Sequence, residues 1–211
     1  MKNMMRRCLA GVMAAAALTG AASAADFTHC ADRLYEMQLF YGTDAGYDLD
    51  RAPSRAEASA MLVRLLGKEA EAQNGKYTAP FTDVPAWAKP YVGWLYQNKL
   101  TFGVGGGKFG SNDKCDARMM SAFLLRTLGY TEANGDFTYA TALEYAASMG
   151  VADTVNQGTT DFTRDEMVAM SYTALSRPTK AGASSLLAAL VNEGAIDAVR
   201  AQDTLALFAD H

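Results

Sequence analysis

Residues 81–129 read FTDVPAWAKPYVGWLYQNKLTFGVGGGKFGSNDKCDARMMSAFLLRTLG, and this stretch decides the fold. It opens on a turn at Asp83-Val84-Pro85, and an aromatic-rich amphipathic segment follows over residues 87–100. A glycine-rich loop over residues 103–110 separates this segment from a second amphipathic segment at residues 116–128. Apolar segments of helical period on either side of turn-forming residues predict a helix–loop–helix unit.

The second helix of this unit recurs on both sides of it with the same length. In each copy the first position of the helix and the position that ends the copy are 12 residues apart in the sequence. These pairs of positions are Arg55 and Gly67, Ala117 and Gly129, and Arg164 and Ser176. The two outer copies begin with a capping box, in which a Ser or Thr and a Glu three residues later satisfy the first amides of the helix. These boxes are Ser54 with Glu57 and Thr163 with Glu166. The shared length and caps predict an all-α fold of three repeats.

The central block resembles one repeat of the S-layer homology (SLH) family, whose pattern is roughly F-x-D-V, W-A, Y-V/I, a glycine-containing loop, T-R-A-E and L-x-R-x-L-G. Residues 81–129 carry Phe-Thr-Asp-Val, Trp-Ala, Tyr-Val, the glycine loop and Leu-Leu-Arg-Thr-Leu-Gly, and the outer copies carry the TRAE-like boxes. The resemblance implies a pseudo-trimeric bundle of three helix–loop–helix repeats. Such a domain anchors exported bacterial proteins to cell-wall polymer.

The resemblance also implies a ligand site. In the family, the Arg of the box and the Asp and Trp of the opening segment line grooves that hold an anionic secondary cell-wall polysaccharide, often capped by a pyruvylated sugar. These roles fall to Arg55, Arg164, Asp83 and Trp87. Both arginines stand at the first position of a helix, where free N–H groups and the helix dipole favour an anion. Helix capping alone would explain the boxes, but the repeat and the resemblance favour a ligand role for the arginines.

The central repeat departs from the family pattern at its box. Ala117 occupies the Arg slot, and Met119 occupies the Glu slot. Arg118 comes one position late and is expected to point about 100° away around the helix. The outer repeats lack the opening F-x-D-V and the Trp. We therefore expect at most two of the three grooves to be intact.

The chain begins with the pattern of a signal peptide over residues 1–24, with a basic start, an apolar run and the small-residue cleavage site Ala22-Ser23-Ala24. This pattern predicts export, to the cell wall or cell surface. The remainder divides into repeat 1 (25–68), a linker (69–80), repeat 2 (81–130), repeat 3 (131–177) and a linker with C-terminal amphipathic helices (178–211).

Charge and hydropathy exclude two classes of partner. Removal of residues 1–24 takes away three basic residues and no acids, and the formal charge changes from -4 to -7. Nucleic acid, which requires a basic face, is therefore not an expected partner. No segment of the mature chain is expected to span a membrane, because about 20 consecutive apolar residues are needed.

The mature chain retains two cysteines, Cys30 and Cys115. In an oxidising exterior they could form one disulfide, and the alternative is two buried thiols. The sequence leaves both alternatives open, since it does not reveal the separation that a disulfide requires.

Catalytic and metal-binding patterns are not expected in this chain. His29 and His211 are its only histidines, and they lie far apart in the sequence. We therefore predict no enzyme activity, no cofactor and no metal site. A carboxylate pair such as Asp161 with Glu166 could serve a wall hydrolase, which is a weaker possibility. The acidic loop that starts at Asp44 lacks the glutamate that a calcium-binding EF-hand needs at its twelfth position.

An alternative function belongs to a different class. The SLH fold could have lost its ligand, and the C-terminal tail over residues 181–211 could dock a protein partner in a structural or interaction role.

Of the two tryptophans, Trp87 is assigned to the ligand site by resemblance, and Trp94 is assigned to the core.

Overall fold

The computed structural model describes residues 26–43, 46–153, 155 and 162–209, so the predicted signal peptide lies outside its described part. Within these ranges the chain is helical, and its β-type contacts are isolated bridges. The helices are α1 (Thr28–Glu36), α2 (Arg55–Leu65), α3 (Glu69–Asn74), η1 (Ala86–Ala88), α4 (Lys89–Gln97), α5 (Ala117–Thr127), η2 (Glu132–Asn134), η3 (Tyr139–Thr141), α6 (Ala142–Ser148), α7 (Arg164–Ser176), α8 (Leu186–Asn192) and α9 (Ala198–Ala209). The all-α fold class is confirmed. None of these described helices has both the length and the apolar character needed to cross a membrane.

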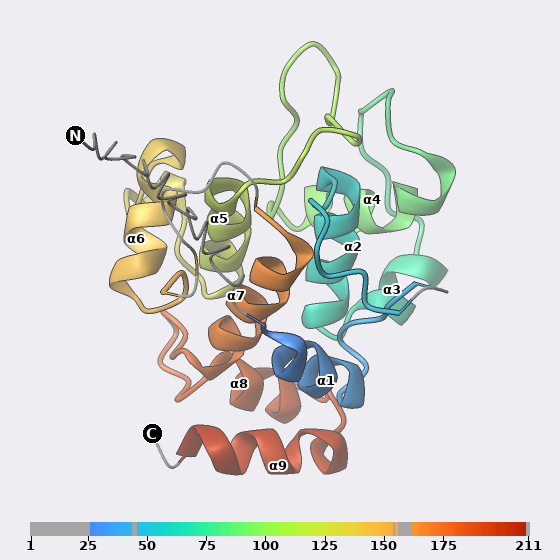
Figure 1. Cartoon of the computed structure of the whole chain (residues 1–211). Coiled ribbons are helices and arrows are strands. Elements are labelled where there is room, and N and C mark those ends of the chain that lie inside the picture. The colour runs from blue at the N-terminus through green and yellow to red at the C-terminus, as the bar shows by residue number, and fades with distance from the viewer. Residues whose placement is uncertain (1–25, 44–45, 154, 156–161, 210–211) are drawn as a thin grey trace, which may run out of the picture.

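The helices α2, α5 and α7 lie at the centre of the molecule (Figure 1). They begin at Arg55, Ala117 and Arg164, the slots that the spacing predicts. Both predicted capping boxes are present, and in α5 the Asp116 carboxylate accepts a hydrogen bond from the Met119 amide at 2.7 Å. These helices supply most of the largest fully buried side chains, which include Leu62, Leu65, Met120, Phe123, Leu124, Leu125, Met167 and Met170. Burial of this apolar surface is the main stabilising contribution to the bundle.

Each central helix packs against the first helix of the next predicted repeat. Helix α2 contacts α4, α5 contacts α6, and α7 contacts α1. The last of these pairs joins the two ends of the repeat region. There the carboxylate of Asp165 accepts the backbone N–H of Phe27 at 3.0 and 3.2 Å. The first and third predicted repeats are therefore directly connected in space.

One local prediction is wrong. Residues 69–74 of the predicted linker form α3, which packs on α4 and α2. This helix was missed because it buries only one of its residues, Ala72, and so shows no apolar stripe. Helix α1 ends at Glu36 and Gln38 then turns the chain with a left-handed φ of 61°, although Met37 and Phe40 continue the apolar spacing of the helix. Both apolar side chains are nevertheless buried.

The C-terminal tail forms two helices, as its sequence predicts. Helix α8 packs on α7, and α9 packs on α8 along the edge of the molecule (Figure 1). The turn between them approaches the end of α2 so closely that a Cβ atom at Gly67 would overlap the carbonyl oxygen of Ala195. The ring of Phe208 lies 5.3 Å from that of Tyr172 on α7. The tail is thus packed on the described bundle at both α2 and α7.

Candidate functional site

Arg55 is the first residue of α2, and only 7% of it is exposed. Its Nη2 group donates to the carbonyl of Phe102, and its Nη1 group lies 3.3 Å from Sδ of Met119. The guanidinium carbon lies 4.7 Å from the ring centre of Phe109 and 5.7 Å from that of Phe123. Among the described residues its Nε has no hydrogen-bond partner. Burial lowers the pKa of this guanidinium, so an anionic partner would stabilise its charge.

A pocket of about 390 Å³ opens beside Arg55. Its lining includes the rings of Phe102 and Tyr139, both about half exposed, and a second guanidinium from Arg126. Arg126 donates to the carbonyl of Leu100 at 3.1 Å and makes an ion pair with Glu132. Aromatic surface combined with a guanidinium that lacks a carboxylate partner suits a ring-shaped ligand with an acidic group.

Arg164 holds the corresponding position at the start of α7 and is also buried. Its Nε and Nη2 groups donate to the carbonyl of Tyr47 at 3.2 and 3.1 Å, and its Nη1 group lies 3.9 Å from Oε1 of Glu57. It lines a pocket of about 200 Å³ together with Trp87, which is 50% exposed, and Arg64. The structure therefore brings Arg164 and Trp87 together, and it places Arg55 in a separate pocket.

The two pockets are built from equivalent positions of the predicted repeats. Arg55, which begins α2, faces the side of α5. Arg164, which begins α7, faces the side of α2. The equivalent pairs are Ala122 with Ala60, Phe123 with Met61, Arg126 with Arg64, and Phe102 with Tyr41. A glycine follows both Phe102 and Tyr41 in the sequence. Sequence reasoning missed Arg64 and Arg126, although both stand at the arginine of the L-x-R-x-L-G motif.

The prediction that the helix starts offer free N–H groups is wrong. The amides of Arg55 and Ala56 donate to the carbonyls of Asp113 and Ser111 at 2.8 and 3.1 Å. At α7, the amide of Arg164 likewise donates to the carbonyl of Arg51 at 2.9 Å. A loop of the neighbouring predicted repeat supplies these acceptors, which local sequence does not reveal. Any anion would therefore meet the arginine side chains and not the first amides of these helices.

Asp83 lies outside the lining of both pockets and holds the glycine loop in place. Its carboxylate accepts backbone N–H groups from Phe109 at 2.7 Å, Gly110 at 2.8 Å and Ser111 at 3.4 Å. The hydrogen bond from Phe109 is the main reason that the pKa of Asp83 is lowered. Because Phe109 packs under the Arg55 guanidinium, Asp83 can influence that pocket through the loop.

Glu57 connects helix capping to the Arg164 pocket. Burial alone would raise the pKa of Glu57, but hydrogen bonds from Arg51 and from the Ser54 amide lower it to about 2. The unfolded value is near 4.5, so the stabilisation from this carboxylate is present above pH 4.5 and is lost as the pH falls towards 2.

We expect Glu57→Gln, which keeps a capping group, to lower the free energy of unfolding at pH 7 by about 2–3 kcal/mol. The difference from the parent protein should shrink below pH 4.5 as the parent carboxylate becomes protonated. Urea unfolding at pH 7, 4 and 2.5 measures this difference. A constant difference at all three pH values would contradict the assigned charge pairing.

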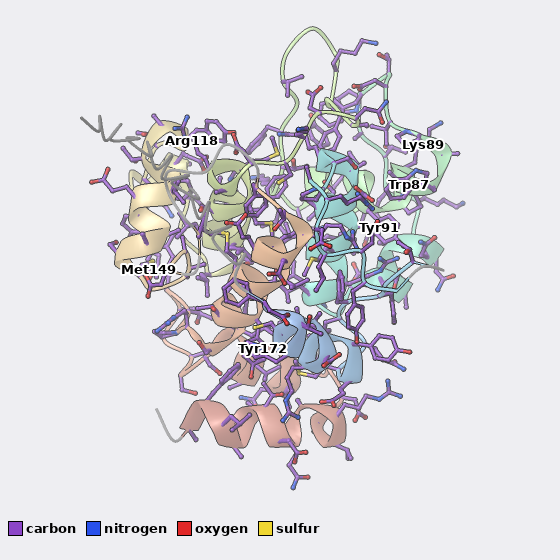
Figure 2. The ribbon with its side chains drawn as sticks, in the orientation of Figure 1. Trp87, Lys89, Tyr91, Arg118, Met149 and Tyr172 are labelled. Atoms are coloured by element: carbon purple, nitrogen blue, oxygen red, sulfur yellow. The ribbon has the colours of Figure 1, made fainter. Side chains whose placement is uncertain are left out.

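Four further residues are placed as follows. Trp94 is buried in the core, and its indole N–H donates to Glu71 at 2.9 Å. Cys30 on α1 and Cys115 just before α5 are buried free thiols, so the disulfide is not formed in this structure. Arg118 is exposed and lies on the opposite side of the view from Trp87 (Figure 2).

Comparison with known proteins gives two matches. The S-layer homology domain family matches residues 80–116, which include the opening motif and the glycine loop. A protein of Thermoanaerobacter kivui named "Cell surface protein" is 29% identical over 150 residues, which cover 69% of this chain and 19% of that relative. The chain thus spans about a fifth of the relative's length. The chain therefore contains a segment, residues 80–116, that is similar to the S-layer homology domain family.

Proposed function

We propose that this protein binds an anionic cell-wall polysaccharide non-covalently and that the Arg55 and Arg164 pockets hold it. The observation that carries the proposal is the Arg55 guanidinium, which is buried, has an unpartnered Nε and borders a pocket of about 390 Å³. A buried cation of this kind is costly unless an anion joins it. An acidic sugar, such as a pyruvylated one, would supply a carboxylate for the guanidinium and a ring face for the aromatic side chains.

The equivalence of the two pockets supports the three-repeat organisation that underlies this function. Each pocket requires an arginine from one predicted repeat and a helix face from the next. We therefore propose repeats at residues 25–68, 81–130 and 131–177, related by an approximate threefold arrangement of α2, α5 and α7. In this arrangement Trp87 contributes directly to the Arg164 pocket, and Asp83 positions the loop beside the Arg55 pocket.

A second proposal concerns the C-terminal tail. Helix α9 carries Val199, which is 79% exposed, and Leu207, which is 43% exposed. These side chains favour a protein contact through residues 181–211 in the structural alternative. A purified-protein pull-down that uses the Val199→Lys variant as the control would test this role, since a tail-dependent partner should be lost from the variant.

The wall-binding proposal is tested by co-sedimentation of the purified protein with native cell walls and with walls stripped of secondary polysaccharide. We expect binding to native walls only. Arg55→Ala combined with Arg164→Ala should weaken binding at least tenfold, since two charge-assisted contacts are lost. Arg118→Ala is the matched control, because Arg118 is an exposed arginine next to Ala117, which occupies the Arg position of the box in the central repeat. Wall binding by this variant should be unchanged.

Loss of the arginine side chains could also disturb the fold, because both are buried. Arg55→Lys and Arg164→Lys therefore complete the set, because each keeps a positive charge but loses the planar fork of hydrogen-bond donors. Circular dichroism establishes that each variant is folded. Equal binding to native and stripped walls, or full binding by the folded double variant, would overturn the proposal.

A further inference from the structure

One difference between the two pockets lies at the third residue of the central helix. In α2 this residue is Glu57, which lines the Arg164 pocket, and in α5 it is Met119, which lines the Arg55 pocket. Each side chain is close to the arginine of its own pocket: Glu57 Oε1 lies 3.9 Å from Arg164, and Met119 Sδ lies 3.3 Å from Arg55. The same slot thus presents a carboxylate in one pocket and a thioether in the other.

In the Arg164 pocket the positive charges are compensated by the protein itself. Glu57 lies close to Arg164 and also accepts two hydrogen bonds from Arg51. Arg64, on the opposite wall, makes an ion pair with Glu69 at 2.9 Å. A further carboxylate from a ligand would have to compete with these acids. This pocket also carries the exposed indole of Trp87, which is a flat apolar surface.

In the Arg55 pocket one positive charge is left over. Arg126 makes an ion pair with Glu132, but within the described ranges no carboxylate lies within ion-pair distance of Arg55. Asp113 acts on Arg55 only from farther away. A thioether is a weak acceptor, so Met119 does not compensate the charge. A ligand carboxylate would therefore be the first close anion that this guanidinium meets.

We infer that the two pockets take different sugars of the same polymer: an acidic sugar in the Arg55 pocket and an uncharged sugar ring, stacked on Trp87, in the Arg164 pocket. The third residue of the central helix, Met119 or Glu57, determines this specificity. The inference rests on the proposed polysaccharide binding and adds the chemical class of each site. Aromatic faces accept apolar ring surfaces, whereas unpaired guanidinium groups select carboxylates.

The two probes are methyl glucuronoside, which carries one carboxylate, and methyl glucoside, which carries none. Nuclear magnetic resonance of the ¹⁵N-labelled protein reports on each pocket through the Arg55 Nε–H and the Trp87 indole N–H, and the buried Trp94 indole is the internal reference. Methyl glucuronoside should shift the Arg55 signal at least tenfold more strongly than methyl glucoside does at equal concentration. Both sugars should shift the Trp87 signal to a similar extent. Equal responses of Arg55 to the two sugars would overturn the inference.

Two exchanges at the specificity position supply the second test. Met119→Glu should reduce wall binding far more than Met119→Gln, which has the same shape without the charge. Glu57→Gln should make the Trp87 signal respond more strongly to methyl glucuronoside than to methyl glucoside. Glu166→Gln is its matched control, because it changes the same capping-box position in α7, outside the lining of both pockets.

The outcomes separate this inference from the proposed function. If the parent protein does not bind native walls, the proposed function fails. If it binds them but Met119→Glu and Met119→Gln bind equally well, the wall-binding function stands and the inference is overturned. Circular dichroism of each variant separates loss of binding from loss of structure.

Discussion

Gly67→Ala is expected to destabilise the protein by about 2–5 kcal/mol. Gly67 ends α2 with a left-handed φ of 64°, a conformation that costs alanine about 1–2 kcal/mol. In addition, the new Cβ would overlap the carbonyl oxygen of Ala195 in the turn between α8 and α9. That contact is with backbone, so it can be relieved only by moving the tail away from α2, at a further cost of about 1–3 kcal/mol.

Gly129→Ala provides the matched control, since Gly129 holds the equivalent slot after α5 and has a φ of 91°. There the nearest atom to a new Cβ is the side-chain Cβ of Lys180 at 3.3 Å, which can yield slightly. Urea unfolding followed by circular dichroism should therefore give a loss of about 1–2 kcal/mol for Gly129→Ala. If the two variants lose the same stability, the tail is not held against α2 as described.

The thiols of Cys30 and Cys115 should react at least 100-fold more slowly in the native protein than in the unfolded protein at pH 8. Only 4% of Cys30 and 1% of Cys115 are exposed. Burial raises the pKa of Cys30 to about 11 and also raises the pKa of Cys115. Because the thiolate is the reactive form, the raised pKa alone reduces the reactive fraction of Cys30 about 100-fold, and burial adds to this.

Labelling with a chromogenic disulfide reagent measures these rates, and a Cys8→Ser background removes the cysteine of the predicted signal peptide. In denaturant both remaining thiols should react rapidly and in full. Recovery of no free thiol from the denatured, unreduced protein would show that the disulfide alternative is correct. Rapid labelling of the native protein would show that α1 or the segment before α5 opens easily.

Local sequence predicted the starts of the central helices well. The reason is physical: a capping box specifies where a helix begins through contacts that span three residues, as in Ser54 with Glu57 and Thr163 with Glu166. Helix ends and weakly patterned helices were less predictable. The course of the chain after α1 depends on the left-handed residue Gln38, and α3 shows little apolar pattern because it buries only Ala72.

Long-range relationships were the part that sequence reasoning could not supply. Arg55 and Arg164 were identified as candidates, but which helix face completes each pocket depends on how the repeats pack. For this reason Arg64 and Arg126 were missed, and Met119 was treated only as a departure from the family pattern. The carbonyl groups that accept hydrogen bonds from the first amides of α2 and α7 belong to loops distant in sequence. A local sequence pattern therefore does not predict them.

The pairing of α1 with α7 has a consequence for how the protein acquires its structure. Asp165 and the Phe27 amide that it binds are 138 residues apart, so this contact closes a very long loop. Contacts of such high sequence separation are formed late and slow the folding rate. During synthesis α1 lacks its main packing partner until α7 has been made, and the face that packs on α7 stays unburied until then. We therefore expect the bundle to assemble cooperatively, after α7 is complete, and not repeat by repeat from the first residue onward.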